Sequence, residues 1–336
     1  MDTGLLANDT LDGNHFSRKQ QGSMKPRIVY VSWPPAEITG GSKMIFGHVA
    51  TLVEAGFNAT VASSDPTPPA WLSKSAPLIG LSEIDRDSDI LVFPENHTGF
   101  LAEFATSKNR KKVFCQNQYQ VFRGLGDRRH YADYGVTEII SQSQHVSEFC
   151  HLRFPDTKIS MIPCYVDETL FHLETSKRLQ IAFMPRKRPH ELYVIRDLFA
   201  AAHPDLADVP WRAIDNLPEK DVATVLKQSG IYLSLNQFES FGLSSLEAMA
   251  CGCLVTGFTG FGAREYATTD NGFWAAEADV LEACEKLAQA VRLTQERWSL
   301  YQYMIERGIQ TAQGYSRAAF RERLIAYWQR ELDSCD

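Results

Sequence analysis

Two glutamates in the stretch FESFGLSSLEAMACGC (residues 238–253) are the first candidates for chemistry. Glu239 and Glu247 have seven residues between them, on either side of a Gly/Ser-rich turn. Glu247 also follows Ser244 by three residues, which is the spacing of a helix capping box. These residues alone leave Glu247 equally suited to start a helix and to bind a ligand, whereas Glu239 has no comparable structural role.

Cationic residues follow a predicted strand earlier in the chain. Arg186, Lys187 and Arg188 come directly after the apolar stretch LQIAFMP (179–185). Ligands of parallel α/β sheets bind at the carboxyl ends of the strands. Charge-assisted contacts to phosphate are strong, and Arg can bind two oxygens at once. The pattern supports a diphosphate site and a solvated charge run about equally.

A glycine pair, Gly40–Gly41, lies between the predicted strand 27–33 and a predicted helix that Gly56 ends. Free backbone N–H groups at a helix start favour an anion, although a plain strand-to-helix loop explains the pair equally well. A sugar nucleotide would use all of these features, because its diphosphate requires cations and N–H donors while its hydroxyls require carboxylates.

Other motifs for nucleotides and metals fail. No GxGxxG fingerprint follows the first predicted strand, and the sequence GxxxxGK[ST] does not occur. The Asp-x-Asp pairs of DRDSD (85–89) precede a strand, so a solvated turn is favoured over a metal site. The basic run SKNRKK (107–112) also precedes a strand and is interpreted as solvated surface.

Strand-like and helix-like segments alternate in two successive blocks. The predicted strands lie at 27–33, 58–64, 89–95, 111–118, 138–144 and 158–164, and then at 179–185, 209–215, 231–237 and 253–259. Helical patterns fall between most of them, and residues 167–178 are the expected linker. This alternation predicts two Rossmann-like parallel-sheet α/β domains. A central cleft between them is the expected ligand site.

The bulk composition excludes several classes of protein. The formal net charge of −7 argues against nucleic-acid binding, which requires a basic excess. Seven scattered cysteines lack zinc-type spacing and are typical of a reducing compartment, so a cytoplasmic location is expected. No apolar run approaches the roughly 20 residues of a membrane span. Residues 1–24 show no strand or helix pattern and are interpreted as a disordered leader or extension.

The segment ESFGLSSLEAMACGCLVTG closely resembles the E-x7-E signature of retaining GT-B glycosyltransferases of family 4. Further segments are similar to that family in the expected order, namely GGSKMIFGHVATLVEAGFNATV, IISQSQHVSEFC, KISMIPCYVDETLF and YSRAAFRERLIAYWQREL. The resemblance covers nearly everything from residue 27 on. It implies a GT-B fold with an N-terminal acceptor-side domain (25–172), a nucleotide-sugar donor domain (173–312) and a C-terminal helix (313–336) that packs back on the N-terminal domain.

The resemblance also implies an activity. A sugar would move from a nucleotide-sugar donor to a saccharide or lipid-linked acceptor with retained anomeric configuration, in cell-surface glycan synthesis and without a metal or other cofactor. Peripheral contact with the inner face of the membrane could involve FRGLGDRRH (122–130), although a solvated loop suits that segment better. A GT-B-fold nucleotide-sugar epimerase and a non-catalytic sugar-nucleotide or glycan-binding protein are the alternatives.

The family pattern assigns roles to the donor side. Glu239 would contact the hydroxyls of the donor sugar, Glu247 would hold the ribose hydroxyls, and Arg186 would bind the diphosphate. Further implied donor contacts are Gly40, Gly41, Phe241, Gly242 and Leu243.

Two features depart from the pattern. The lysine that usually follows the arginine after several residues is absent, so Lys187 or Arg188 would replace it. Many members carry a histidine near the reacting carbon, for which His97 is the nearest candidate. Asn117 and Gln118, at the matching strand end, are neutral hydrogen-bonding alternatives.

Overall fold

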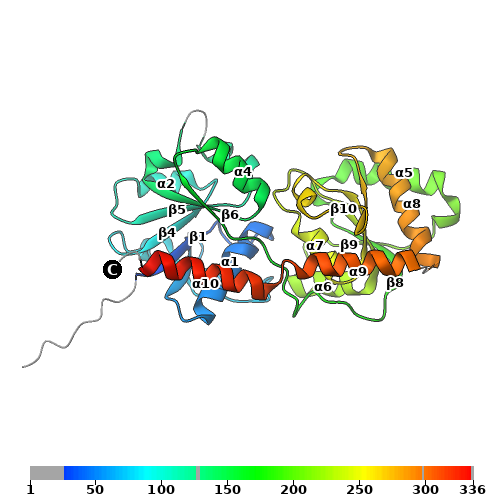
Figure 1. Cartoon of the computed structure of the whole chain (residues 1–336), viewed down its shortest axis with the longest axis horizontal. Coiled ribbons are helices and arrows are strands. Elements are labelled where there is room, and N and C mark those ends of the chain that lie inside the picture. Colours follow the sequence, from blue (N-terminus) through cyan, green and yellow to red (C-terminus); the bar gives the residue numbers. More distant parts are fainter. Residues whose placement is uncertain (1–25, 126–128, 297–298, 334–336) are drawn as a thin grey trace, which may run out of the picture.

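The computed structural model describes residues 26–125, 129–296 and 299–333, which form two α/β domains side by side (Figure 1). The N-terminal domain is built on a seven-stranded parallel sheet with the order β3-β2-β1-β4-β5-β6-β7. Its strands are β1 (Ile28–Val31), β2 (Ala59–Ser63), β3 (Leu78–Gly80), β4 (Ile90–Pro94), β5 (Arg110–Cys115), β6 (Val136–Ser141) and β7 (Lys158–Met161).

The C-terminal domain is built on a five-stranded parallel sheet with the order β12-β11-β10-β8-β9. Its strands are β8 (Arg178–Phe183), β9 (Trp211–Ala213), β10 (Ser229–Leu235), β11 (Leu254–Phe258) and β12 (Gly272–Ala275). The strand order reverses between β8 and β10, as it does between β1 and β4 in the first sheet. Such reversals create the crevices in which α/β sheets bind ligands. The predicted pair of parallel-sheet α/β domains is confirmed.

Helices cover both faces of each sheet. The N-terminal domain contributes α1 (Gly40–Glu54), α2 (Thr98–Glu103), α3 (Gln118–Leu125) and α4 (Gln144–Arg153). The remaining helices are α5 (Pro189–Ala202), α6 (Glu219–Gln228), α7 (Leu243–Ala250), α8 (Val280–Glu296), α9 (Ser299–Gln313) and α10 (Arg317–Asp333). Within the described residues, none of these helices combines the length and apolar character needed to cross a membrane.

Continuous apolar runs explain the central strands. All four residues of β1 and all seven of β10 are buried, because helices cover both faces of each sheet. The predicted strands recur in the structure with ends shifted by a few residues. Two short strands, β3 and β12, were not expected, since three or four residues carry too little periodicity to be recognised. The prediction for residues 1–24 lies outside the described residues.

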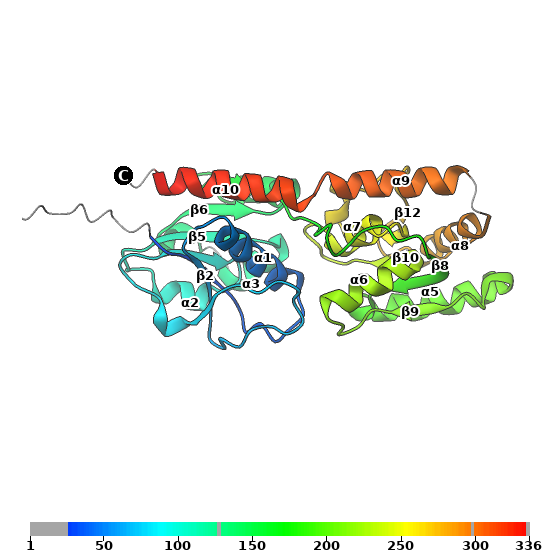
Figure 2. The same ribbon diagram turned by 90° about the horizontal axis from the view of Figure 1, so that it is seen from below.

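The last helix, α10, continues the line of α9 but lies against the N-terminal domain (Figure 2). Trp328 is fully buried, and its Nε1 atom donates a hydrogen bond to the Tyr30 hydroxyl of β1 at 3.3 Å. Lys112 of β5 forms ion pairs with Glu138 of β6 and, at 2.6 Å, with Glu331 of α10. The interpretation of 107–112 as solvated surface is therefore wrong for Asn109, Lys111 and Lys112, which are buried, and Lys112 holds α10 in place through its ion pair with Glu331.

The turn at 85–89 is partly as predicted. Asp85 and Asp87 are exposed, and Asp85 Oδ1 accepts a hydrogen bond from the Asp87 backbone N–H at 2.8 Å. Asp89 differs, because it is buried and forms an ion pair with Arg27 at 2.7 Å. That pairing fixes the entrance to β4 and gives Asp89 a structural role.

Candidate active site

The loop that follows β10 lies against the carboxyl ends of β5 and β6 from the other domain. Asn117 Nδ2 donates a hydrogen bond to the Phe238 carbonyl at 3.0 Å. Two further contacts fix Ser240, whose Oγ accepts a hydrogen bond from Gln142 Nε2 at 2.8 Å and whose carbonyl accepts one from Ser143 Oγ at 3.0 Å. The loop bearing Glu239 is thus held between the two sheets.

Glu239 meets a cation from the neighbouring strand. Its side chain forms an ion pair with Lys187, which lies in a single 3-10 turn after β8. The Glu239 backbone N–H donates to the Gly260 carbonyl at 2.9 Å, so the residue is fixed from both sides. Because β8 and β10 are adjacent, the predicted phosphate-binding turn and the predicted sugar-binding carboxylate converge where the strand order reverses.

The three predicted cations have different environments. Arg186 is exposed and has no hydrogen-bond or ion-pair partner within the part of the chain that the structure describes. Burial and the nearby charge of Arg186 lower the pKa of Lys187 to about 8.

Arg188 is committed to the protein itself. It is buried, donates to the Asn236 carbonyl at 2.7 Å, and pairs with Glu277 at 2.8 Å and Glu191 at 3.0 Å. Its guanidinium also lies over the Phe258 ring. The proposal that Arg188 replaces the missing family lysine is therefore not supported, and Lys187 is the remaining candidate.

Helix α7 does not begin with the expected capping box. The residue at its N-cap is Gly242, whose φ of 78° lies in the left-handed region that favours glycine. An added Cβ there would lie 3.0 Å from Asn236 Nδ2 and 3.1 Å from the Tyr266 hydroxyl. Ser244 instead donates to Asn236 Oδ1 at 3.3 Å. The first turn of α7 thus keeps its backbone N–H groups free of a side-chain cap.

Glu247 is buried and forms an ion pair with Lys43, in the first turn of α1. The same Nζ atom lies 2.7 Å from Glu219 Oε1 of α6. Burial lowers the pKa of Lys43, but the two carboxylates have the larger combined effect, so the pKa of Lys43 is raised. Burial likewise raises the pKa of Glu247 above its ordinary value, against the effect of Lys43. Lys43 was missed in the sequence, although it follows the glycine pair by two residues.

The glycine pair begins α1, as predicted, and Gly41 faces Gln116 at the end of β5. Thr39 caps the helix, accepting a hydrogen bond from the Ser42 N–H at 3.1 Å. An added Cβ at Gly41 would approach Gln116 Oε1 to 3.2 Å, whereas Gly40 faces open space. Gly41 therefore allows the close approach between the helix start and the strand end.

The acceptor-side candidates lie at the ends of β4 and β5. The His97 ring stacks on Trp33, with centroids 3.9 Å apart, and burial lowers the pKa of His97. Its Nδ1 atom is buried without a hydrogen-bond partner among the described residues. Asn117 contacts the donor-side loop directly, whereas both polar side-chain atoms of Gln118 are buried and unpaired within the described residues.

Glu95 is a further buried carboxylate at this edge that sequence reasoning missed. It follows β4 directly, and its Oε2 atom accepts a hydrogen bond from the Gln116 N–H at 3.1 Å. Burial raises the pKa of Glu95 to about 7. A charged residue directly after the wholly apolar run ILVFP was the signal available in the sequence.

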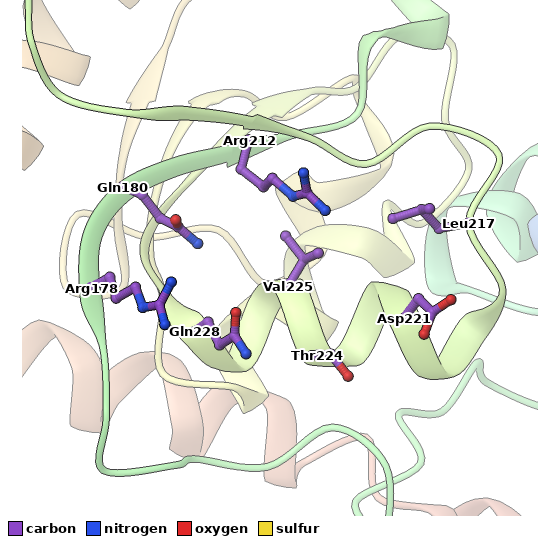
Figure 3. A pocket seen from close by; sticks show the side chains of 8 residues that line it. All are labelled: Arg178, Gln180, Arg212, Leu217, Asp221, Thr224, Val225 and Gln228. Carbon is purple, nitrogen blue, oxygen red and sulfur yellow. The ribbon is translucent and has the colours of Figure 1, made fainter.

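Two other features lie apart from these strand ends. Within the described residues, His203, Cys284 and Glu285 bring possible metal-ligand atoms within 4.8 Å of one another, between α5 and α8. A pocket of about 480 Å³ opens between α6 and strands β8 and β9 (Figure 3). Arg178 in its wall begins β8, whereas Arg186 follows the other end of that strand, so the pocket is not the donor site.

Comparison with known proteins agrees with this architecture. Residues 212–311, which contain Glu239 and Glu247, match the model of the family "Glycosyl transferases group 1". An alpha-1,6-glucosyltransferase of Actinobacillus pleuropneumoniae is 28% identical over 273 residues, covering 78% of this chain and 83% of the relative. Sucrose-phosphate synthase from Thermosynechococcus elongatus has a TM-score of 0.68 at 13% identity, covering 93% of this chain and all of that one.

The fold is GT-B. Anabaena HepE in complex with UDP and glucose is another GT-B structure of this kind, with a TM-score of 0.65 at 12% identity over 91% of this chain and all of that one. Together, the family match and the GT-B neighbours support a glycosyltransferase. In GT-B terms, Glu239 and Lys187 belong to the C-terminal domain, and Gly41 and His97 to the N-terminal domain.

Proposed function

We propose that this protein is a retaining, metal-independent glycosyltransferase of family 4 type. It would transfer a sugar from a nucleotide-sugar donor to a saccharide or lipid-linked acceptor in cell-surface glycan synthesis. The observation that carries the proposal is the contact between Lys187 and Glu239, which joins a cationic turn and a carboxylate where the strand order reverses. A lipid-linked acceptor would bring the protein to a membrane surface, and the proposal includes that peripheral contact.

The donor diphosphate would meet Arg186, Lys187 and the start of α7. Arg186 is free to form a charge-assisted contact, and the N-terminus of α7 offers N–H groups and the positive end of its dipole. The backbone of Phe241, Gly242 and Leu243 lies at that helix start. Glycine at the N-cap allows a ligand to approach the chain closely.

The two glutamates would bind the neutral parts of the donor. Glu239 would accept hydrogen bonds from the hydroxyls of the transferred sugar, which separates it from Lys187 and frees that cation for phosphate. Glu247 would accept from the ribose hydroxyls in place of Lys43. Binding of the nucleotide would thus replace the ion pairs of Glu239 and Glu247 with lysines by hydrogen bonds between these glutamates and the nucleotide.

These residues also explain how the reaction could proceed without a metal. Cleavage of the glycosidic bond leaves an oxocarbenium-like sugar, while negative charge grows on the departing diphosphate. Fixed cations and helix N–H groups that stabilise this charge lower the barrier. On the acceptor side, His97 and Asn117 come from the ends of β4 and β5 and would line the approach of the acceptor hydroxyl, with Gln118 as a buried neighbour.

A nucleotide-sugar screen tests the proposal. UDP-glucose is the first donor to use, because related GT-B structures contain UDP and glucose and a relative carries the name of a glucosyltransferase. Binding should raise the melting temperature with donor concentration, and slow hydrolysis should release UDP. Glu239→Ala should abolish hydrolysis, whereas Glu103→Gln, an exposed change on α2, should not alter it.

Outcomes separate the proposal from its alternatives. A protein that binds a nucleotide-sugar but neither hydrolyses nor transfers it would be a binding protein. Conversion of the donor to its epimer without release of UDP would indicate the epimerase. A flat thermal response to every nucleotide-sugar would overturn all three ideas.

A further inference from the structure

Exposed aromatic side chains gather where the strand ends of the two domains meet. Within the described residues, six Phe, Tyr and Trp side chains are exposed: Trp33, Tyr119, Phe122, Tyr193, Phe238 and Tyr303. Four of these lie at or beside the strand ends that form the domain interface, on the β1, β5 and β10 loops and on α3. Large exposed apolar groups concentrated in one place mark binding surfaces, whereas scattered ones need no explanation.

Trp33 is held as a flat surface. The residue is 45% exposed, and its ring stacks on His97 at an interplanar angle of 12°, so one ring face is covered while much of the side chain stays accessible. Trp33 Nε1 donates to Asn96 Oδ1 at 3.0 Å, which fixes the rotation of the indole. The side chain is therefore oriented before any ligand arrives.

Tyr119 and Phe238 form a second aromatic pair, which spans the two domains. Their rings meet edge to face with centroids 5.3 Å apart, and they remain 39% and 62% exposed. Asn117 links the same two segments through its bond to the Phe238 carbonyl. Phe238 also has a φ of 51°, a left-handed conformation that is strained in a residue other than glycine and that is concentrated at functional sites.

The two pairs follow neighbouring strands. Trp33 follows β1, His97 follows β4 and Asn117 follows β5, and these strands are adjacent in the sheet. Strands lie about 4.8 Å apart, so three strand ends span about 10 Å, enough for one or two pyranose rings. We define Trp33, His97, Tyr119 and Phe238 as the aromatic platform. Asn96 and Asn117 supply amide groups beside it.

We propose that the aromatic platform binds a neutral sugar ring of the acceptor by stacking. A pyranose ring has an apolar face of C–H groups and a rim of hydroxyls, which suits an open aromatic face flanked by amides. The inference rests on the proposed function, because Phe238 adjoins Glu239 and places the platform next to the reacting carbon. It narrows the acceptor to a glycan that presents a sugar ring rather than an isolated lipid phosphate.

The experiment uses full-length protein saturated with UDP and four probe disaccharides: maltose, isomaltose, lactose and diacetylchitobiose. Saturation-transfer NMR should show binding of at least one, with the C–H protons of one ring face receiving most of the transfer. Trp33→Ala and Tyr119→Ala should each weaken that binding about fivefold to tenfold. Trp33→Phe should recover most of it, because a flat ring is restored.

Tyr193→Ala is the matched control, since Tyr193 is an exposed aromatic on α5 outside the platform. It should leave disaccharide binding unchanged. Equal binding by Trp33→Ala and wild type, or no binding of any probe by the wild type, would overturn the inference. So would loss of binding to phosphatidylglycerol vesicles in Trp33→Ala with sugar binding intact, which would show a membrane contact. Failure of the proposed function is read separately, as absence of UDP-glucose binding to the wild type.

Discussion

The ammonium group of Lys43 in α1 forms an ion pair with Glu247 in α7, across the boundary between the two domains. The same group lies 2.7 Å from Glu219, so one cation is shared by two carboxylates of the C-terminal domain. All three groups are largely removed from solvent. The carboxylate proposed to hold the ribose is thus already neutralised by the opposite domain.

Loss of the shared cation should destabilise the protein. Lys43→Met leaves Glu219 and Glu247 close together without a counter-charge, and removing one partner of a buried pair costs about 3 kcal/mol or more in the free energy of unfolding. Urea denaturation measures the change. Lys227→Met removes an ion pair whose partner Glu174 is exposed, and should cost less than about 1 kcal/mol. Equal losses in the two variants would contradict the shared-cation account.

Glu247 should recognise the ribose. Glu247→Gln should weaken UDP binding about tenfold or more, because a hydrogen bond to a charged acceptor is lost. With the 2′-deoxy or 3′-deoxy analogue that lacks the contacted hydroxyl, the same substitution should have little further effect. Titration calorimetry of both proteins with UDP and with the deoxy analogue measures the coupling energy between the Glu247 side chain and the ribose hydroxyl. Glu219→Gln, which also removes a partner of Lys43, controls for the ion pair and should not discriminate between UDP and its analogues.

The neighbouring arginines should separate binding from stability. Arg186→Ala should weaken UDP binding about tenfold and leave thermal stability near that of the wild type, because Arg186 is exposed and unpaired within the described chain. Arg188→Ala should instead lower the melting temperature strongly, since it removes the buried donor of Glu277 Oε2 and of the Asn236 carbonyl. Weaker UDP binding by Arg188→Ala together with a lower melting temperature of Arg186→Ala would contradict these assignments.

Glu95 should make stability depend on pH. Its folded-state pKa of about 7 lies above the ordinary value of 4.5, so the folded protein binds more protons between these values. The favourable contribution of the protonated carboxyl is complete below about pH 4.5 and is lost as pH rises towards 7, amounting to about 3 kcal/mol at most. Glu95→Gln should flatten this slope in urea titrations at successive pH values. The exposed change Glu103→Gln should retain it.

Much of the donor side was predictable because it is local in sequence. Strand ends in parallel sheets carry ligand residues, so the positions of Arg186, Glu239 and Gly41 follow from the order of apolar runs. The prediction from local sequence failed for Ser244. Gly242 adopts a left-handed conformation and serves as the N-cap, so the helix starts before Ser244. The prediction also failed for Arg188, whose partner Glu277 lies 89 residues away.

Contacts between the domains were beyond the reach of the sequence. Lys43 and Glu247 are 204 residues apart, and nothing in the local pattern distinguishes Lys43 from an exposed lysine on a helix. Lys112 is similar, because its burial depends on Glu331 at the far end of the chain. The pairing of Trp33 with His97 likewise required the order of β1 and β4 in the sheet, which alternation alone does not specify.

Because α10 returns to the N-terminal domain, two segments of the chain connect the domains. The chain passes between the domains once after β7 and again after α9, and the passing segments pair where the Val166 N–H donates to the Tyr315 carbonyl at 2.9 Å. Two linked crossings permit the domains to rotate relative to each other about one hinge axis and restrict rotation about other axes. The domains would therefore open for the nucleotide by rotation about that single axis. Cutting the chain at either crossing would remove this restriction without altering any residue that contacts the substrate.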